Sequence, residues 1–338
     1  MKERTRLRLK GYFDYNFGDD YMMKIIIDSL PEVEFVIDEQ EKLPRLLKEC
    51  GNVTVTDTPD ENLEVLYVTG SGFMINNNKA LLYELVWLIK GKNRGDYCLG
   101  CNIEPLDTWL KKWLIVQRLN KFKLLVCRDT KSYKWLCSNV KKPVIKQLPD
   151  IVLSLEGLPE ATGDKLGIAM MHRLGDEEDC AYYRAMAEIA DHWVETTGRE
   201  VILFAFDSGI EDDVFACDCV KKMMKHKERA TYAVHRDGGE IIEGYTQCKK
   251  IIGARFHSIV LAIKMGIDVY PVAYREKVKN LIDDLTYPVK GCAIDSIDAE
   301  GMKAFLLHDV KYVYEKNKLD QSFKYAEYLK EAIGMNRG

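Results

Sequence analysis

Short apolar runs alternate with longer amphipathic segments along most of the chain. In the first part, the apolar runs predict strands at residues 7–13, 34–37, 53–56, 64–69, 96–101 and 124–127. Apolar positions at helical spacing predict the intervening helices, which lie at residues 19–30, 80–90, 108–120 and 130–137. Strands that alternate with helices of this length are typical of parallel βαβ units.

The alternation stops at residues 147–165, where Pro149, Gly157, Pro159 and Gly163 accumulate, and this segment is typical of a domain boundary. The pattern then restarts, with strands predicted at residues 166–171, 201–206, 230–234, 250–253 and 268–272. Helices are predicted at residues 179–196, 212–226, 240–248, 257–265 and 276–285, and a tail of two helices around Asn317 at 298–333.

Two consecutive sets of this kind predict an α/β protein of two doubly wound, Rossmann-like domains that face each other across a cleft. We place the first domain at residues 1–160 and the second at 161–315. Residues 316–338 form a C-terminal helix that we expect to pack back on the first domain. Ligands of doubly wound sheets bind beyond the carboxyl ends of the strands, so the cleft is the expected site.

Composition supports a globular protein and excludes several classes. Of 338 residues, 47% are hydrophobic and 30% charged, as in ordinary globular domains. The formal net charge of −4 does not indicate a general nucleic-acid binder. No apolar run reaches the roughly 18–20 residues of a membrane span, and no apolar stretch of a secretory signal follows the first residues. We therefore expect an intracellular protein.

The ten cysteines are scattered and are interpreted as reduced, mostly buried thiols. Cys98 and Cys101 form a lone CxxC pair, whereas a structural zinc site usually needs two such pairs. We therefore assign no metal-binding residues and expect no resident cofactor, and the sequence leaves metal dependence open.

Two loops of the first domain follow predicted strands and contain small residues. In the first, Gly18 permits a tight turn and Asp19 can cap the following helix. In the second, Gly70 and Gly72 allow a ligand close to the backbone, and the helix start behind them favours anions. This loop is no dinucleotide fingerprint, because Ile75 stands where the last glycine would be. Each loop can equally be an ordinary strand-to-helix turn.

The most informative segment is residues 253–258, GARFHS, at the start of an apolar helix. Cations at a helix N-terminus are disfavoured by about 0.3–1 kcal/mol each, so Arg255 and His257 call for a compensating anion. A phosphate or carboxylate ligand would supply it, with Arg255 as a bidentate clamp and His257 as a proton donor or acceptor. Alternatively, Arg255 pairs with a core carboxylate and His257 satisfies a backbone carbonyl.

Arg173 follows the first strand of the second domain. In a doubly wound sheet its side chain would point to the same cleft, although an exposed loop arginine explains the residue equally well.

Taken in order, these segments resemble the polysaccharide pyruvyl transferase family. The family's N-x-G-D-[ED] pattern corresponds to residues 16–20, its glycine cluster to 70–72, its S-x-R-D-x-x-S stretch to 127–132, and its D-P-V junction to 150–152. Arg173 follows the expected strand, G-x-R-x-H corresponds to 253–257, and the later tyrosine and lysine to Tyr274 and Lys277. The resemblance spans roughly residues 10–285. It departs from the family at residues 99–105, where one glycine of G-Q-G-x-G-P is lost, and at Asn76, where some members carry an acid.

The resemblance implies a glycosyltransferase-B-like fold and transfer of pyruvate from phosphoenolpyruvate to two hydroxyls of one sugar, which forms a cyclic ketal. It implies Arg173 and Arg255 as the donor clamp and His257 as the acid or base. Further donor or acceptor contacts are implied for residues that match the family's motifs, namely Asn16, Asp19, Gly70, Gly72, Asn76, Arg128, Tyr274 and Lys277. The donor would bind the second domain and the acceptor the first.

The family's setting is capsule and exopolysaccharide synthesis, so the resemblance implies a cytoplasmic enzyme. Its acceptor would be a sugar, an oligosaccharide or a lipid-linked saccharide, and a lipid-linked acceptor would bring the enzyme to the inner membrane surface. Two other functions stay open on this architecture: a nucleotide-sugar glycosyltransferase, and a non-catalytic carbohydrate-binding protein.

Overall fold

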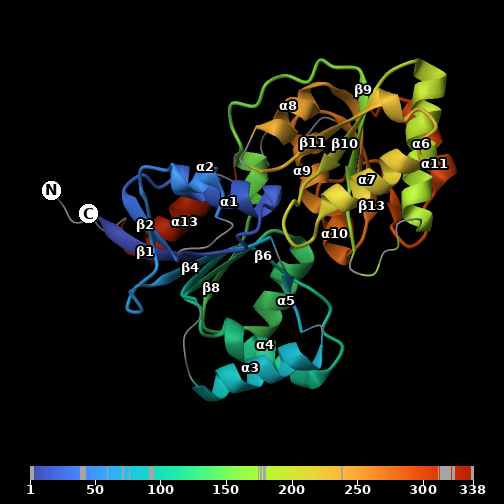
Figure 1. Ribbon diagram of the computed structural model, residues 1–338. Helices are drawn as coiled ribbons and strands as arrows, with labels where there is room; N and C mark the ends of the chain where they lie inside the picture. Colours follow the sequence, from blue (N-terminus) through green and yellow to red (C-terminus); the bar gives the residue numbers. More distant parts are fainter. Residues whose placement is uncertain are drawn as a thin grey trace.

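The first domain is a twisted parallel sheet with helices on both faces, as the computed structural model shows (Figure 1). The structure describes residues 4–38, 43–58, 60–70, 72–75, 77–90, 95–173, 175, 177, 180–236, 239–310, 312, 321 and 324–335. The strands of the first domain pair in the spatial order β3 (Val53–Thr56), β2 (Val33–Asp38), β1 (Thr5–Lys10), β4 (Val65–Val68), β6 (Tyr97–Ile103), β7 (Leu124–Cys127) and β8 (Val144–Gln147). The short strand β5 (Gly72–Phe73) lies beside the end of β6.

The helices of this domain connect successive strands. They are α1 (Phe17–Asp28), α2 (Arg45–Lys48), α3 (Asn78–Lys90), α4 (Trp109–Leu119) and α5 (Thr130–Asn139). A 3-10 turn, η1 (Ile151–Ser154), then leads along an extended segment to the second domain.

The second domain repeats the plan. Its parallel strands lie in the order β11 (Ala230–Val234), β10 (Val201–Ala205), β9 (Lys165–Met170), β12 (Cys248–Gly253), β13 (Asp268–Ala273) and β14 (Cys292–Ala293). The helices that cover it are α6 (Ala181–Thr197), α7 (Asp213–Met223), α8 (Glu240–Thr246), α9 (Phe256–Lys264), α10 (Glu276–Asp284) and α11 (Ala299–Leu307), with a 3-10 turn, η2 (Lys227–Arg229), before β11. The predicted fold class, two Rossmann-like domains of glycosyltransferase-B type, is thus confirmed.

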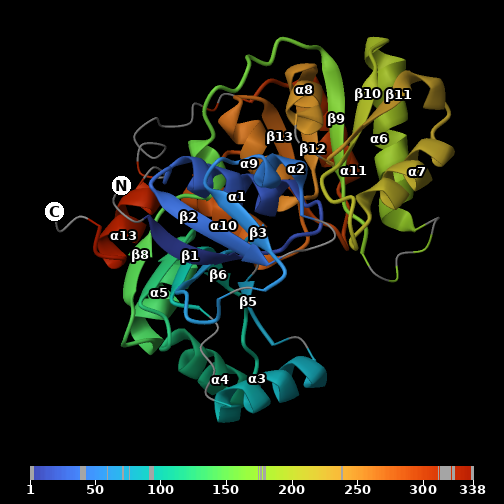
Figure 2. The ribbon, with the colours of Figure 1, turned by 60° about the vertical axis from the view of Figure 1, so that its left-hand side comes forward.

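Helix α9 explains why the two domains lie so close together. Its residues from Phe256 to Ile263 are all buried, although most surface helices bury only one stripe. One side of α9 packs on its own sheet and the other reaches α1 and η1 of the first domain (Figure 2). The all-round apolar sequence of α9 is therefore the signature of a helix enclosed between domains.

The predicted strands and helices recur within a few residues of their expected ends, and the elements that were missed are short or exposed. Strand β8 lies at the edge of its sheet with no fully buried side chain, so it shows no apolar alternation. Strands β5 and β14 have two residues each and α2 has four, which is too short for a periodic signal. Asn317, the predicted break in the tail, lies outside the described residues. No helix in the described part of the chain has the length and apolar character needed to cross a membrane.

The C-terminal helix α13 (Lys324–Ala332) packs against the first domain although it follows the second in sequence (Figures 1 and 2). Tyr325 and Leu329 are buried in the core that they share with β7 and its neighbours. The Tyr325 hydroxyl donates a hydrogen bond of 3.0 Å to the carbonyl of Pro149, next to the domain junction. The C-terminal helix is therefore part of the first domain's core.

We predict that Leu329→Ala lowers the free energy of unfolding by about 2–5 kcal/mol, because it leaves a cavity under α13. Glu327→Ala, at an exposed position of the same helix, is the control and should change stability by less than about 0.5 kcal/mol. Urea denaturation measures the free energy of unfolding of both variants. Equal values for the two would show that Leu329 does not pack in the core of the first domain.

Candidate active site

The pocket between the domains lies where both sheets change their direction of winding. In the first sheet the chain moves from β1 to one side and returns on the other at β4, and in the second sheet β9 and β12 stand in the same relation. Open α/β sheets bind ligands beyond the carboxyl ends of such strand pairs. Loops after these strands and their neighbours line the pocket, and they contribute Tyr12, Asn16, Asp19 and Gly70 from the first domain and Met171, Phe206, Glu211, Arg255, Phe256, His257, Tyr274, Arg275 and Lys277 from the second.

Asn16 joins the two domains at the start of α1. Its side-chain oxygen accepts hydrogen bonds from the backbone N–H groups of Gly18 and Asp19, at 3.1 and 3.3 Å, which caps the helix. Its amide nitrogen donates to the Oδ2 of Asp207, at the end of β10, over 3.0 Å. Both polar groups of Asn16 are thereby used in placing α1 against the second domain.

Gly18 allows the imidazole of His257 to lie directly on the first turn of α1. A Cβ added at Gly18 would lie 1.6 Å from the Nδ1 of His257, and one added at Gly70 would lie 3.1 Å from its Cε1. Only glycine at position 18 permits this approach. Gly18 and Gly70, which lie in separate loops of the sequence, therefore both lie against the imidazole of His257.

His257 faces a buried ion pair. The Nη1 of Arg128 lies 2.8 Å from the Oδ2 of Asp150, and both side chains are almost completely buried. The Nε2 of His257 lies 3.7 Å from the same Oδ2 atom, within ion-pair range but beyond hydrogen-bond distance, and has no hydrogen-bond partner among the described residues. Burial alone would raise the pKa of Asp150, but the charges of His257 and Arg128 hold it well below its usual range.

Asp19 is a second buried carboxyl beside His257. Its Oδ1 accepts a hydrogen bond of 3.0 Å from the backbone N–H of Gly70. Burial raises the pKa of Asp19, although the neighbouring charges of His257 and Lys277 act in the opposite direction. The pocket thus holds an imidazole and a carboxyl in contact with the same glycine loop.

Arg255 is engaged by carboxylates. Its Nε and Nη2 lie 2.8 and 2.5 Å from the two oxygens of Asp213, and its Nη1 pairs with Glu211. Pairing with a core carboxylate was the alternative that the sequence left open for Arg255, and it is the arrangement found. Burial works against the charged guanidinium, but Asp213 and Glu211 hold its pKa above its ordinary value.

The other expected donor-clamp residue, Arg173, lies apart from the described residues that line the pocket. It follows β9 and forms an ion pair of 2.5 Å with Asp295. Arg128 lies behind the pocket, where it also donates to the carbonyl of Gly70 at 2.6 Å and covers the ring of Phe256 at 4.0 Å. The structure therefore does not present Arg173 and Arg255 as a pair of free guanidinium groups.

Two further cations that line the pocket, Arg275 and Lys277, come from the start of α10. The Nζ of Lys277 lies 3.4 Å from the Gly70 carbonyl and about equally far from the rings of Tyr274 and Phe256, at 5.3 and 5.5 Å. Arg275 contacts the first domain through the sulfur of Met74, 3.4 Å from its Nη1. Arg255 and Arg275 are the N-caps of α9 and α10, and neither side chain caps its helix. Two helices thus begin at the pocket without a side-chain cap, and the first N–H groups of a helix favour an anion.

The remaining expected residues lie as follows. Gly72 is in β5, paired with Asn102 of β6, and is not among the lining residues. Asn76 lies outside the described residues. Six cysteines are buried and form no disulfide bond, namely Cys98, Cys101, Cys127, Cys217, Cys219 and Cys248. In the described part of the chain, no group of three His, Cys, Asp or Glu side chains is arranged to hold a metal ion.

Sequence reasoning missed several lining residues, notably Tyr12, Phe206, Glu211 and Arg275. A signal was present for two of them. Phe206 is the last residue of a predicted strand, and Arg275 stands between Tyr274 and Lys277, both already singled out. Glu211 lies in a loop without any local pattern, so only the fold brings it to the pocket.

The model of the polysaccharide pyruvyl transferase family matches residues 16–276, which include the pocket-lining loops from Asn16 onward. The chain belongs to the polysaccharide pyruvyl transferase family. No curated protein sequence matches it significantly.

Solved structures similar to this family member share its fold at low sequence identity. One is a UDP-GlcNAc 2-epimerase from Methanocaldococcus jannaschii, with a TM-score of 0.59 and 9% identity over 97% of this chain and 100% of that chain. Another is Anabaena Alr3699/HepE in complex with UDP and glucose, with a TM-score of 0.52 and 12% identity over 99% of this chain and 98% of that chain. At such identities the similarity establishes only the two-domain architecture of this chain.

We predict that Gly18→Ala displaces His257 and destabilises the protein by about 1–3 kcal/mol, because the new methyl group overlaps the imidazole. The control is Gly51→Ala, where an added Cβ has no neighbour within 4 Å. Chemical denaturation measures stability, and the NMR signals of the His257 ring report the displacement. Unchanged ring signals in Gly18→Ala would contradict the close approach.

Asp207 generates a prediction about pH. Burial raises its pKa to about 7, with Asp213 and Glu211 adding to the effect and Arg255 opposing it. Between the ordinary value of 3.8 and about 7, the folded state therefore binds more protons than the unfolded state, and the free energy of unfolding falls as pH rises through this window. Asp207→Asn should remove this contribution, so that its melting temperature falls less steeply with pH than that of the wild type. Parallel pH profiles for the two proteins would show that Asp207 does not titrate there.

Proposed function

We propose that this protein transfers pyruvate from phosphoenolpyruvate to two hydroxyls of a sugar in a polysaccharide or its precursor, forming a cyclic ketal. The observation that carries the proposal is the combination of Lys277 and Arg275 with the two helix starts that lack side-chain caps, α9 and α10, at one pocket. Phosphoenolpyruvate carries a phosphate and a carboxylate, and both groups suit this electropositive corner. Membership of the pyruvyl transferase family supports the same reaction class.

The reaction needs a proton donor at the donor's methylene carbon. Protonation there turns the methylene into a methyl group and leaves an oxocarbenium-like centre at the adjacent carbon. One sugar hydroxyl attacks this carbon, the bond to the phosphate oxygen breaks, and the second hydroxyl closes the ring. Two hydroxyl protons are released, and phosphate leaves.

His257 is the proposed acid for the first step. Its Nε2 has no hydrogen-bond partner among the described residues, and an imidazole is a common proton donor in catalysis. The Oδ2 of Asp150 lies 3.7 Å from this nitrogen, and Gly18 leaves the room that the ring occupies. Asp19, buried beside His257, is the proposed acceptor of a proton from a sugar hydroxyl on the first-domain side.

The arginines have different proposed roles. Arg128 holds the Gly70 loop and Asp150 in place from behind the pocket. Arg255 lines the pocket beside Asp213 and Glu211. A carboxylate or phosphate of the donor that displaced Glu211 would accept a hydrogen bond from the Nη1 of Arg255. Arg173 would reach the donor only on releasing Asp295.

We predict that Lys277→Met weakens binding of phosphoenolpyruvate more than about tenfold, since it removes a cation from the pocket while keeping the aliphatic stem. His257→Ala should retain part of the binding and abolish release of phosphate in the presence of an acceptor. Calorimetric titration measures binding and a phosphate assay measures turnover. Lys279→Met, which removes an exposed lysine of the same helix that pairs with Glu276, is the matched control and should bind normally.

UDP and GDP in the same titration test the glycosyltransferase alternative. Binding of a nucleotide without any response to phosphoenolpyruvate would overturn the proposed function. Equal affinities for phosphoenolpyruvate in Lys277→Met and Lys279→Met would overturn the proposed donor site.

A further inference from the structure

A concentrated apolar surface lies outside the pocket. Among the described residues, ten large apolar side chains are exposed, and five of them lie on α3 and α4, namely Leu82, Tyr83, Val86, Trp109 and Trp113. Trp109 is 78% exposed and Leu82 is 62% exposed. We call these five residues, with the exposed Lys79 and Lys112 beside them in sequence, the α3–α4 face. Patches of this kind mark interaction sites.

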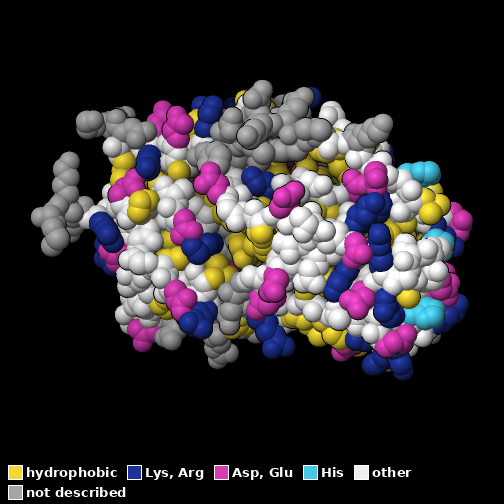
Figure 3. All heavy atoms as spheres, turned by 90° about the horizontal axis from the view of Figure 1, so that it is seen from above, with side chains coloured by type: hydrophobic (Ala, Val, Ile, Leu, Met, Phe, Trp, Pro, Cys, Tyr) yellow, Lys and Arg dark blue, Asp and Glu magenta, His cyan; other side chains and the backbone are white. Residues whose placement is uncertain are grey.

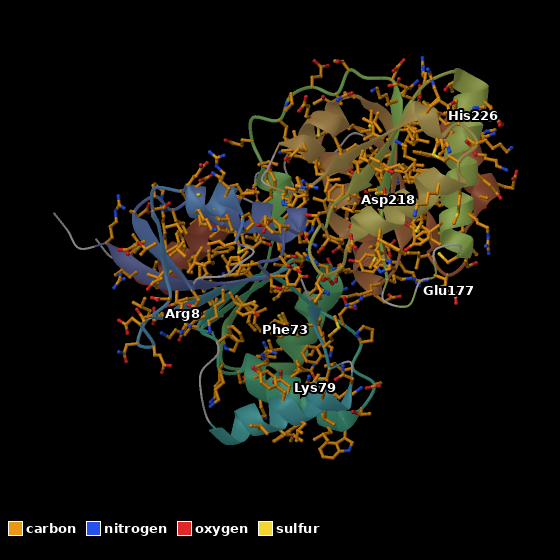
Figure 4. All side chains as sticks on the ribbon, in the orientation of Figure 1. Arg8, Phe73, Lys79, Glu177, Asp218 and His226 are labelled. Carbon is orange, nitrogen blue, oxygen red and sulfur yellow. The ribbon has the colours of Figure 1, made fainter. Side chains whose placement is uncertain are left out.

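The α3–α4 face lies on the same side of the first domain as the pocket. Helices α3 and α4 pack side by side below the sheet, and they follow the carboxyl ends of β5 and β6 (Figures 1 and 2). The segment just before α3 connects the two places, because Arg118 of α4 lies 5.1 Å over the ring of Phe73 while Met74 contacts Arg275 of the pocket. Figure 4 shows Phe73 on the sheet side of α3 and Lys79 on the helix itself.

The charge of these helices is opposite in sign to that of the whole chain. The sequences of α3 and α4 contain five basic residues, Lys79, Lys90, Lys111, Lys112 and Arg118, against the single acid Glu84, whereas the chain has a net charge of −4. Glu84 is buried in an ion pair of 2.9 Å with Arg118, so its charge is not displayed. The same pair neutralises Arg118, and Lys111 pairs with Asp107 over 2.9 Å. On the face of the molecule seen from above in Figure 3, by contrast, acidic and basic side chains are interspersed. The α3–α4 face therefore combines exposed aromatic rings with the positive charges of Lys79 and Lys112, which form no ion pair with the described residues.

These properties favour one occupant over another. In a symmetric contact between two copies, the same cationic surface would face itself, and this costs electrostatic energy. An anionic bilayer complements the charge instead. Tryptophan and tyrosine rings are enriched at the boundary between lipid headgroups and acyl chains, and lysines flanking an apolar face are attracted to anionic lipids.

We propose that the α3–α4 face docks on the surface of an anionic lipid bilayer. The helices would lie in the plane of the interface, with Leu82, Trp109 and Trp113 inserted among the headgroups and Lys79 and Lys112 at the anionic surface. Docking brings the pocket side of the first domain toward the membrane. This arrangement suits an acceptor sugar carried on a lipid, a consequence that rests on the proposed function, whereas docking itself does not.

Co-sedimentation of the full chain with vesicles tests the proposal without any substrate. The wild type should bind vesicles that contain phosphatidylglycerol and should bind pure phosphatidylcholine vesicles more than about tenfold more weakly, with binding reduced by salt. The variant Leu82→Ser with Trp109→Ser should lose more than about tenfold in affinity. The control is Leu307→Ser, which alters a comparably exposed leucine, 69% exposed, on α11 of the second domain and should bind like the wild type.

Charge reversal provides a second test that leaves the apolar residues intact. Lys79→Glu with Lys112→Glu changes only exposed side chains, and it should abolish the preference for phosphatidylglycerol. Absence of vesicle binding by the wild type, or equal binding by the serine variant and the Leu307→Ser control, would overturn the proposal. So would a wild-type dimer in sedimentation velocity that the serine variant converts to a monomer, because the occupant would then be a second copy. Titration with phosphoenolpyruvate is independent of all these outcomes, so failure of docking and failure of the proposed function are distinguishable.

Discussion

A buried ion pair at the domain junction organises the pocket. Arg128 and Asp150 have almost no contact with solvent, and a pair of charges in such a place is tolerated only when its hydrogen bonds are satisfied. The two terminal nitrogens of the guanidinium donate to Asp150, the Gly70 carbonyl and Asn102, and the ring of Phe256 lies across its face, while its Nε has no partner among the described residues. One side chain thus links the end of β7, the glycine loop after β4, the junction before η1 and the start of α9.

The position of His257 follows from this arrangement. Phe256 packs on the guanidinium, so the next residue of α9 is directed at the first turn of α1, where Gly18 leaves room for an imidazole. Asp150 supplies the negative charge on one side and Asp19 a buried carboxyl on the other. The histidine therefore depends on contacts from both domains and from the segment that joins them.

The pocket is divided into two electrostatic halves. On one side, Asp207, Glu211 and Asp213 surround Arg255 and outnumber it. On the other, Lys277, Arg275 and the start of α10 present positive charge. An anionic donor fits the second half. The fold itself does not decide this, since structures of similar architecture include a UDP-GlcNAc 2-epimerase.

The alternation of apolar runs and amphipathic segments was sufficient to predict both domains, their order and nearly all long helices, because local periodicity records which face of each element is buried. It also placed Gly18 and Gly70 in loops after strands and His257 and Lys277 at the starts of the helices that follow strands, where doubly wound sheets bind ligands. The sequence could not show which charges meet. Arg255 pairs with Asp213 and Glu211 from more than 40 residues away, and Arg173 with Asp295 from 122 residues away. These ion pairs form because the fold brings distant segments together and because an unpaired buried charge costs free energy. Only the tertiary structure determines which segments meet and which charges are buried.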